Sequence, residues 1–283
     1  MTMWSDLAEC SFQLGFVDAA GVRTRSLRAG SGENIVFLHG TSGHLEAFIR
    51  NIPAHSAQYR CHAIDMLGHG YTGKPNYPYE IPRYVGHLRD YLDAVGVDRV
   101  HLVGESLGGW VAAWFASEDP ARVASLQLIA PGGSVANPAV MQRIRESTER
   151  AVLSTDIALT RERLALLMYD PVNATDELVE IRHRIYHQPD FIRNIGNLLC
   201  LQDMEVRQRN LLSANRLAKI TAPTLIIWGN ENPFGDVPEA VSLHHAIAGS
   251  RLEIFPRCGH WPQHEHHAYY DKLSLAFLAE NGA

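Results

Sequence analysis

Short runs of apolar residues, many of them β-branched, alternate along the chain with longer amphipathic stretches. Each run ends in glycine, proline or a polar turn, a pattern typical of strands buried on both faces of a parallel sheet. The runs predict strands at residues 34–40, 61–65, 100–104, 123–130, 223–229 and 251–256. The amphipathic stretches predict helices at about 82–95, 107–118, 237–248 and 265–280. This alternation indicates an α/β architecture with a mostly parallel sheet.

Two segments depart from this alternation. The opening stretch "FQLGFVDAAGVRTRSLRAG" predicts an antiparallel hairpin that turns near "DAAG" and brings the sheet to eight strands. Residues 132–213 contain only amphipathic helical stretches and follow the sixth strand. We expect them to form a helical lid over the carboxyl edge of the sheet, where open α/β sheets bind ligands. The predicted domains are a core at 1–131 and 214–283 and a lid at 132–213.

Composition narrows the class of protein. The formal net charge of −6 over 283 residues argues against a nucleic-acid partner and against an anionic membrane surface. The four cysteines are scattered without a C-x-x-C pair, so we expect reduced thiols, although a bridge between two of them stays open. The first residues show no secretory pattern, and no apolar run approaches the ~20 residues of a membrane span. We therefore expect a soluble, cytoplasmic protein.

A serine lies between glycines where the predicted strand at 100–104 meets the predicted helix at 107–118. Residues 104–108 fit the pattern G-x-S-x-G, in which a sharp turn lifts the serine hydroxyl above the sheet edge. The free N–H groups of the following helix would then lie beside a developing oxyanion. The pattern predicts that Ser106 is a nucleophile. The alternative is that Ser106 only caps the helix.

A serine hydroxyl needs a neighbouring base to become a nucleophile. Among the fifteen histidines, His260 stands in "CGHWP" directly after the last predicted strand, at the same edge of the sheet as the serine. Its place late in the chain fits the order serine, acid, histidine expected for this fold. We predict that His260 is the base. The neighbouring His264, His266 and His267 lack the ligand spacing of a known metal site, so no metal is predicted.

An oxyanion hole requires two backbone N–H donors. Leu107, the residue after the nucleophile, should supply one of them. The loop after the strand at 34–40 should supply the other from Thr41 or Ser42, unless this loop is an ordinary β-turn. Together with the serine and the histidine, these donors predict a serine hydrolase.

Four segments carry a resemblance to a known family: "FLHGTSG", "AIDMLGHGYTGKP", "LVGESLGGW" and "CGHWPQHEH". Over nearly its whole length the chain resembles the α/β-hydrolase superfamily, and "DMLGHG" with "CGHWPQ" resembles the meta-cleavage-product hydrolases. The resemblance implies a cofactor-independent enzyme, commonly a dimer or larger. Such enzymes cleave a carbon–carbon bond in vinylogous 1,5-diketones from aromatic-ring degradation. The alternatives are an esterase or lactonase and a non-catalytic ligand-binding homologue.

The chain departs from that family at the acid of the triad. The family carries an aspartate in a W-G-x-x-D pattern after the seventh strand, and here Asn232 stands in its place. An asparagine can accept the imidazole N–H bond, but it cannot stabilise the imidazolium by charge. We predict that Asn232 orients His260, with Glu231 and Asp236 as the alternatives.

The family resemblance also suggests substrate-binding residues. The stretch "EIRHRIYHQPDF" resembles the family's R-W-x-x-x-x-x-Q-P segment and places Arg182 at the substrate carboxylate, with Arg184 as the alternative. An arginine suits this task because its donors form a fixed fork. The resemblance places Trp261 on the pocket wall, where plain core packing is the alternative. The expected partner is a small-molecule substrate.

Overall fold

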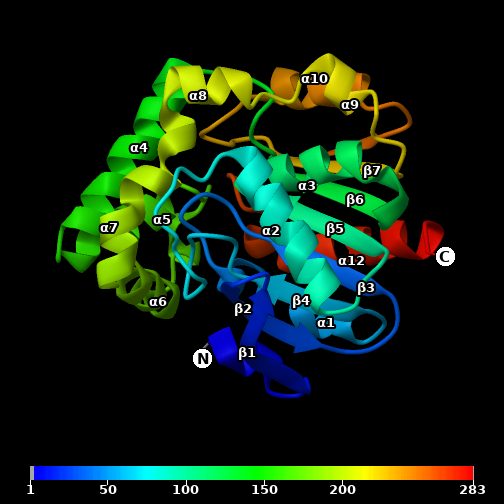
Figure 1. Ribbon diagram of the computed structural model, residues 1–283, viewed down its shortest axis with the longest axis horizontal. Helices are drawn as coiled ribbons and strands as arrows, with labels where there is room; N and C mark the ends of the chain where they lie inside the picture. The colour runs from blue at the N-terminus through cyan, green and yellow to red at the C-terminus, as the bar shows by residue number, and fades with distance from the viewer. Residues whose placement is uncertain (1–2, 283) are drawn as a thin grey trace.

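The computed structural model describes residues 3–282, which fold around one eight-stranded sheet (Figure 1). The strands follow the order β1-β2-β4-β3-β5-β6-β7-β8, and among the described strands β2 is the one that runs opposite to the others. The predicted α/β fold with a mostly parallel sheet is therefore confirmed. The strands are β1 (Phe12–Ala19), β2 (Val22–Ala29), β3 (Asn34–Leu38), β4 (Arg60–Ile64), β5 (Val100–Glu105), β6 (Val123–Ile129), β7 (Thr224–Gly229) and β8 (Arg251–Phe255).

The hairpin predicted near "DAAG" is formed by β1 and β2. Its two turn residues, Ala20 and Gly21, have φ angles of 49° and 89°. Two positive φ angles are typical of the primed turns that match the twist of paired strands. The N–H of Gly21 donates to Asp18 Oδ1 at 2.6 Å and closes the turn.

Alternate residues of the central strands enter two separate cores, one on each face of the sheet. In β3, Val36 and Leu38 join the core under α2, α3 and α10, whereas Ile35 and Phe37 join the core under α1 and α12. The helices are α1 (Ile52–Ser56), α2 (Ile81–Ala94), α3 (Leu107–Glu118), α10 (Val237–Ala246), α11 (Pro262–Glu265) and α12 (His267–Glu280). The helix predicted at about 265–280 is confirmed, and it starts at His267 because the chain leaves helical conformation at His266 (ψ 42°).

A carboxyl group is buried where α12 packs against the start of α1. Asp271 is 8% exposed, and its Oδ1 accepts a hydrogen bond from Asn51 Nδ2 at 2.8 Å. Burial raises the pKa of Asp271 to about 7, and the hydrogen bond from Asn51 offsets only part of that rise. The fold therefore holds a proton on Asp271 that the unfolded chain, with a carboxyl pKa of about 3.9, releases at lower pH.

Asp271→Asn should raise the free energy of unfolding at pH 8 by about 1–3 kcal/mol, because the fold no longer has to bury a carboxylate. For the unsubstituted protein, stability should fall as pH rises from about 4 to about 7 and then level off. Urea denaturation at pH 5 and pH 8 measures both effects. A variant that gains nothing at pH 8 would contradict this assignment.

Between β6 and β7 the chain runs through six helices, most of which form the left-hand side of Figure 1. The N–H of Leu212 donates to the carbonyl of Gly133 at 2.9 Å and ties the end of the excursion to its start. The division into core and lid at 132–213 stays a prediction. The helices are α4 (Pro138–Leu153), α5 (Ile157–Ala165), α6 (Asp176–Tyr186), α7 (Pro189–Leu198), α8 (Met204–Arg209) and α9 (Ala214–Leu217).

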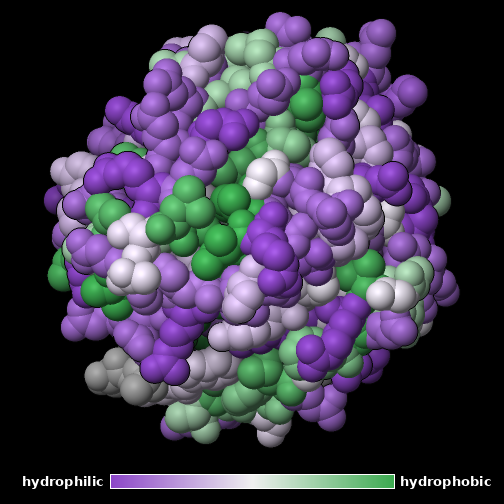
Figure 2. Space-filling model, turned by 60° about the vertical axis from the view of Figure 1, so that its left-hand side comes forward, coloured by the Kyte–Doolittle hydropathy of each residue, from purple (hydrophilic) through white to green (hydrophobic). Residues whose placement is uncertain are grey.

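Figure 2 turns this side of the molecule forward and shows hydrophobic residues exposed among hydrophilic ones. Large apolar residues exposed on these helices and their connections include Leu153, Ile157, Tyr169, Val172 and Ile192. Over residues 3–282, no helix is both long enough and apolar enough to span a membrane.

Candidate active site

Ser106 lies in the sharp turn between β5 and α3. Its φ of 53° and ψ of −111° are a strained conformation for a residue with a side chain, as expected of a nucleophile turn. The flanking glycines allow the turn, because a Cβ on Gly108 would collide with the carbonyl of Leu38, and one on Gly104 with the carbonyl of Gly108. The side chain of Ser106 makes no capping hydrogen bond, so the alternative of a simple helix cap is wrong.

His260 and Asn232 meet beside this turn. Nδ1 of His260 lies 2.9 Å from Oδ1 of Asn232. The N–H of Phe234 donates to the same oxygen at 3.1 Å, which identifies that atom as the amide oxygen. His260 therefore donates from Nδ1, and Nε2 is the nitrogen left to act as a base. The structure thus brings Asn232 to the position expected of the orienting group.

The two alternative acids are bound elsewhere. Glu231 accepts from the N–H of Cys258 at 2.9 Å and from the side-chain amide of Asn230 at 3.0 Å. Asp236 accepts from the N–H of Glu239 at 3.0 Å and so caps α10. Both carboxylates therefore accept hydrogen bonds from groups other than His260, and Asn232 is the partner of the imidazole Nδ1.

Two small cavities, of about 40 and 20 Å³, adjoin Ser106 and His260. Thr41, Phe234 and Ile144 line both of them, so they form two halves of one site. Their combined size suits a few water molecules. A larger substrate would therefore enter only if side chains of the covering helices move aside.

The predicted oxyanion donors lie at different depths. Leu107 is the first residue of α3, where a helical N–H has no partner one turn back, and it lines the larger cavity with Thr41. Ser42 instead is fully buried with a φ of 57°, and its Oγ accepts from Tyr186 at 3.0 Å. Gly43 N–H donates to the carbonyl of Gly40 at 2.9 Å, so the loop is also a turn. Leu107 and Thr41 are thus better placed as donors than Ser42.

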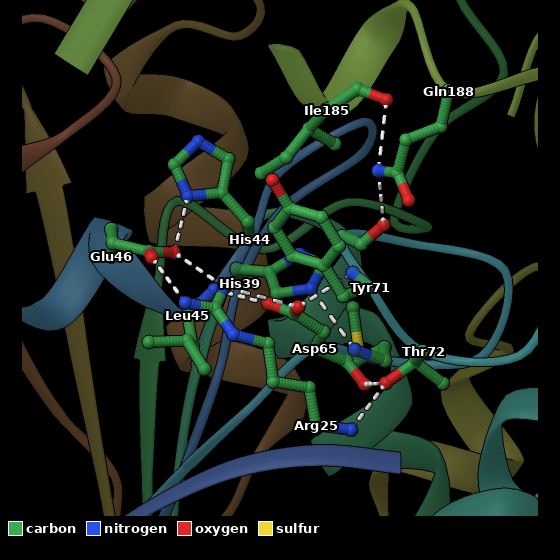
Figure 3. Close-up of polar contacts among 12 residues, drawn as sticks. Arg25, His39, His44, Leu45, Glu46, Asp65, Tyr71, Thr72, Ile185 and Gln188 are labelled. Atoms are coloured by element: carbon green, nitrogen blue, oxygen red, sulfur yellow. Dashed lines mark hydrogen bonds and ion pairs between the residues drawn. The ribbon is translucent and has the colours of Figure 1, made fainter. Parts of the chain in front are cut away.

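A buried charged network supports this loop (Figure 3). Glu46 accepts from Arg25 at 2.7 Å and from His44 at 2.8 Å. Asp65 accepts from the N–H of Leu45 at 2.7 Å and lies 3.4 Å from Arg25. Burial alone would raise the pKa of Glu46, but the hydrogen bond from His44 and the charge of Arg25 hold it well below its ordinary value. The network fixes the backbone that follows β3.

Arg182 lies behind the same loop, on α6. Its Nη1 donates to the carbonyl of Ser42 at 2.9 Å and to Tyr186 at 3.2 Å, while Nε and Nη2 are buried without a protein partner. Its guanidinium carbon is 5.7 Å from the ring centre of Trp261, which lines the smaller cavity. Arg184, the alternative, has a side chain that is 71% exposed and pairs with Glu180, so it is a solvated arginine.

Two charged residues of the site, Arg163 and Glu105, were not predicted from the sequence. Arg163 of α5 lines the smaller cavity, is 3% exposed, and has an Nη1 without a protein partner. Burial lowers its pKa from the ordinary arginine value. The available signal was its place on one face of α5 with Thr160 and Leu164, the other two buried residues of that helix. Glu105, the residue before the nucleophile, is 1% exposed and puts Oε1 3.2 Å from Nε2 of His260.

The neighbouring histidines have backbone partners. Nε2 of His264 lies 3.1 Å from the carbonyl of Asn173, and Nε2 of His266 lies 3.0 Å from the carbonyl of Arg257. Over the described residues, no group of three or more histidine, cysteine, aspartate or glutamate side chains is arranged to hold a metal ion.

Comparisons with known proteins identify relatives of this chain. A 2-hydroxy-6-oxo-6-phenylhexa-2,4-dienoate hydrolase of Burkholderia cepacia is 32% identical over 262 residues, which cover 89% of each chain. A 2-hydroxymuconate semialdehyde hydrolase of a Pseudomonas species is 31% identical, with 94% of this chain and 93% of that one covered. The solved meta-cleavage product hydrolase of Pseudomonas fluorescens has a TM-score of 0.81 at 28% identity and covers 94% of this chain and 97% of its own.

A family model described as the alpha/beta hydrolase fold matches residues 33–267, which include the strands from β3 onward, the covering helices, Ser106 and His260. The match spans most of the chain, and the relatives at about 30% identity cover nearly all of it. The chain belongs to the α/β-hydrolase family, and within that family it is similar to meta-cleavage-product hydrolases.

Proposed function

We propose that the protein hydrolyses a carbon–carbon bond in a meta-ring-fission product, a vinylogous 1,5-diketone that carries a carboxylate. The observation that carries this proposal is a serine, a histidine and buried arginines around one cavity. Ser106 and His260 line it together with Arg163, and Arg182 stands behind its wall with two unused donors. The relatives named for such reactions support the choice of substrate class.

The residues divide the reaction as follows. His260 moves a proton when the dienol becomes a ketone, and again when the carbon–carbon bond breaks, because a carbon leaving group departs only as a stabilised enol. Ser106 provides the attacking oxygen or activates a water molecule. The N–H groups of Leu107 and Thr41 receive the negative charge that forms on the attacked carbonyl oxygen.

The experiment that tests this function compares two substrate classes. Coloured ring-fission dienols should be cleaved with a higher kcat/KM than nitrophenyl esters of similar size. Preference for the esters would favour the esterase or lactonase alternative. Binding without turnover of either class would favour a non-catalytic ligand-binding protein.

Arg182→Gln should lower kcat/KM for a carboxylate-bearing dienol about 10- to 100-fold, the size of a lost charged hydrogen bond, and should spare a neutral nitrophenyl ester. The exposed Arg184 provides the matched control, because Arg184→Gln removes the same charge from the same helix outside the site. Equal losses on both substrates would mean that Arg182 acts only through the carbonyl of Ser42. The same measurement on Arg163→Gln shows which of the two arginines binds the substrate carboxylate.

We further propose that the enzyme works in the cytoplasm without a cofactor. Nucleophile, base and oxyanion donors all come from its own residues, which supports the second point. All four cysteines are free thiols, which supports a reducing compartment: Cys10, Cys61, Cys200 and Cys258. Assembly into a homodimer or larger oligomer stays a prediction.

A further inference from the structure

We propose that Glu105 supplies to His260 the negative charge that Asn232 lacks. The inference rests on the proposed roles of Ser106 and His260. Oε1 of Glu105 lies 3.2 Å from Nε2 of His260, and the two side chains are 1% and 6% exposed. A carboxylate and an imidazole at this distance, both shielded from water, interact far more strongly than an exposed pair.

The backbone around Glu105 makes room for its carboxyl group. A Cβ placed on Gly40 would lie 2.5 Å from Oε2 and 2.9 Å from Oε1 of Glu105. The carboxyl group therefore occupies the space that a side chain at position 40 would fill, between the oxyanion loop and His260. Because Glu105 ends the buried strand β5, the turn that presents Ser106 also fixes this neighbour.

Within residues 3–282, the carboxyl group of Glu105 is buried without the hydrogen bonds that a buried structural carboxylate usually has. Neither oxygen of Glu105 has a well-aligned hydrogen bond among the described residues. A buried carboxyl group without hydrogen bonds is costly and persists where another interaction compensates. His260 is the charge partner at contact distance. Because the oxygen lies 3.2 Å from Nε2 without forming an aligned hydrogen bond, Glu105 acts through its charge.

Asn232 and Glu105 together then perform the two tasks of the usual aspartate, which are to orient the imidazole ring and to stabilise its positive charge. Asn232 accepts from Nδ1 and fixes the ring, while Glu105 offers a charge beside Nε2. As the oxygen of Ser106 attacks, its proton moves to Nε2, and the resulting imidazolium lies beside the Glu105 carboxylate. The proton then passes to the leaving group, and the ring returns to its neutral form.

Other charged groups surround this pair, and each could shift its pH response. Arg163 of α5 lines the same cavity as Glu105 and His260. Glu239 of α10 and Arg207 of α8 line the larger cavity with His260, and Arg182 of α6 lies behind the oxyanion loop. The test therefore substitutes Glu105 alone, with glutamine, which removes the charge and keeps nearly the same side-chain volume.

The experiment measures how fast a fluorophosphonate probe labels Ser106 as a function of pH, in the full chain. Glu105→Gln should lower the plateau rate at high pH about tenfold or more and move the acid limb of the profile to lower pH. Without the carboxylate the imidazolium is less stable, so the ring is a weaker base and loses its proton at lower pH. Glu231→Gln, which changes a nearby carboxylate outside the site, should leave the profile unchanged.

A rescue variant separates charge from structure. Asn232→Asp, combined with Glu105→Gln, returns a carboxylate to the ring from the Nδ1 side and should restore most of the labelling rate. An unchanged profile in Glu105→Gln would overturn the inference. So would a slower rate whose acid limb does not move and which Asn232→Asp does not restore, because that result describes a structural role.

Because the probe reacts with Ser106 directly, it tests the role of Glu105 without relying on the proposed substrate. Labelling of Ser106 without cleavage of any ring-fission dienol would contradict the proposed function and still test Glu105. A Ser106 that the probe does not label in the unsubstituted protein would overturn the inference, because no base-activated serine would then exist for Glu105 to serve.

Discussion

Ser106→Ala should lower kcat about 10⁴- to 10⁶-fold and leave the fold intact, since removal of the nucleophile from a serine hydrolase has an effect of this size. The oxygen of Ser106 makes no capping hydrogen bond to α3, so its loss removes no contact that stabilises the helix. Turnover of a ring-fission dienol and thermal unfolding, measured on the same preparation, check the two parts of this expectation.

Ser117 provides the matched control on the same helix. Its Oγ donates to the carbonyl of Trp114 at 2.6 Å, at the far end of α3 from the cavity. Ser117→Ala should keep kcat within about twofold. Activity of Ser106→Ala within about tenfold of the unsubstituted protein, equivalent to roughly 1.4 kcal/mol of barrier, would exclude Ser106 as the nucleophile.

Glu46→Gln should lower the free energy of unfolding by about 3–5 kcal/mol at pH 7, because it leaves the buried guanidinium of Arg25 short of a charged partner. Asp65, at 3.4 Å, is the weaker remaining partner of Arg25. Urea denaturation at pH 7 measures the loss. The variant should also lose activity at temperatures below its unfolding transition, because the network fixes the loop that presents Thr41.

A control variant and the pH dependence of stability both test the expected effect of Glu46→Gln. Glu180→Gln breaks the exposed pair with Arg184 and should change stability by less than about 0.5 kcal/mol. Since the pKa of Glu46 is lowered in the fold, its stabilising effect is present above the ordinary carboxyl range and is lost as pH falls below it. Glu46→Gln should therefore be less sensitive to acid. A loss below about 1 kcal/mol would mean that Asp65 alone balances Arg25.

The sequence predicted those parts of the site that depend on local turns. Ser106 was identifiable because glycines must stand at fixed offsets around a sharp turn, and His260 because it follows a strand whose edge is known. Asn232 was identifiable only through the family resemblance, because it stands where the W-G-x-x-D pattern of that family has its aspartate. For Ser106 the neighbours in sequence determine where the side chain lies, whereas His260 and Asn232 reach it because β7 and β8 end at the same sheet edge.

The parts that were missed depend on packing between distant segments. Glu105 follows a strand in sequence, but its partners are Gly40 after β3 and His260 after β8. Arg163 of α5 lines the cavity beside Gly40 and Ser106, residues that are distant from it in sequence. Ser42 is buried where its carbonyl accepts a hydrogen bond from Arg182 of α6, a contact that no local pattern indicates.

The hydrogen bond from Leu212 to Gly133 has a consequence for how this protein can diverge. Because this hydrogen bond joins the two ends of the excursion, the chain between them forms a closed loop. The entropy of closing a loop grows only with the logarithm of its length, about 0.6 kcal/mol for each doubling. Lengthening an exposed connection between Gly133 and Leu212 therefore adds little closure entropy, whereas deleting α6 would also remove the hydrogen bonds of Arg182 and Tyr186 to Ser42.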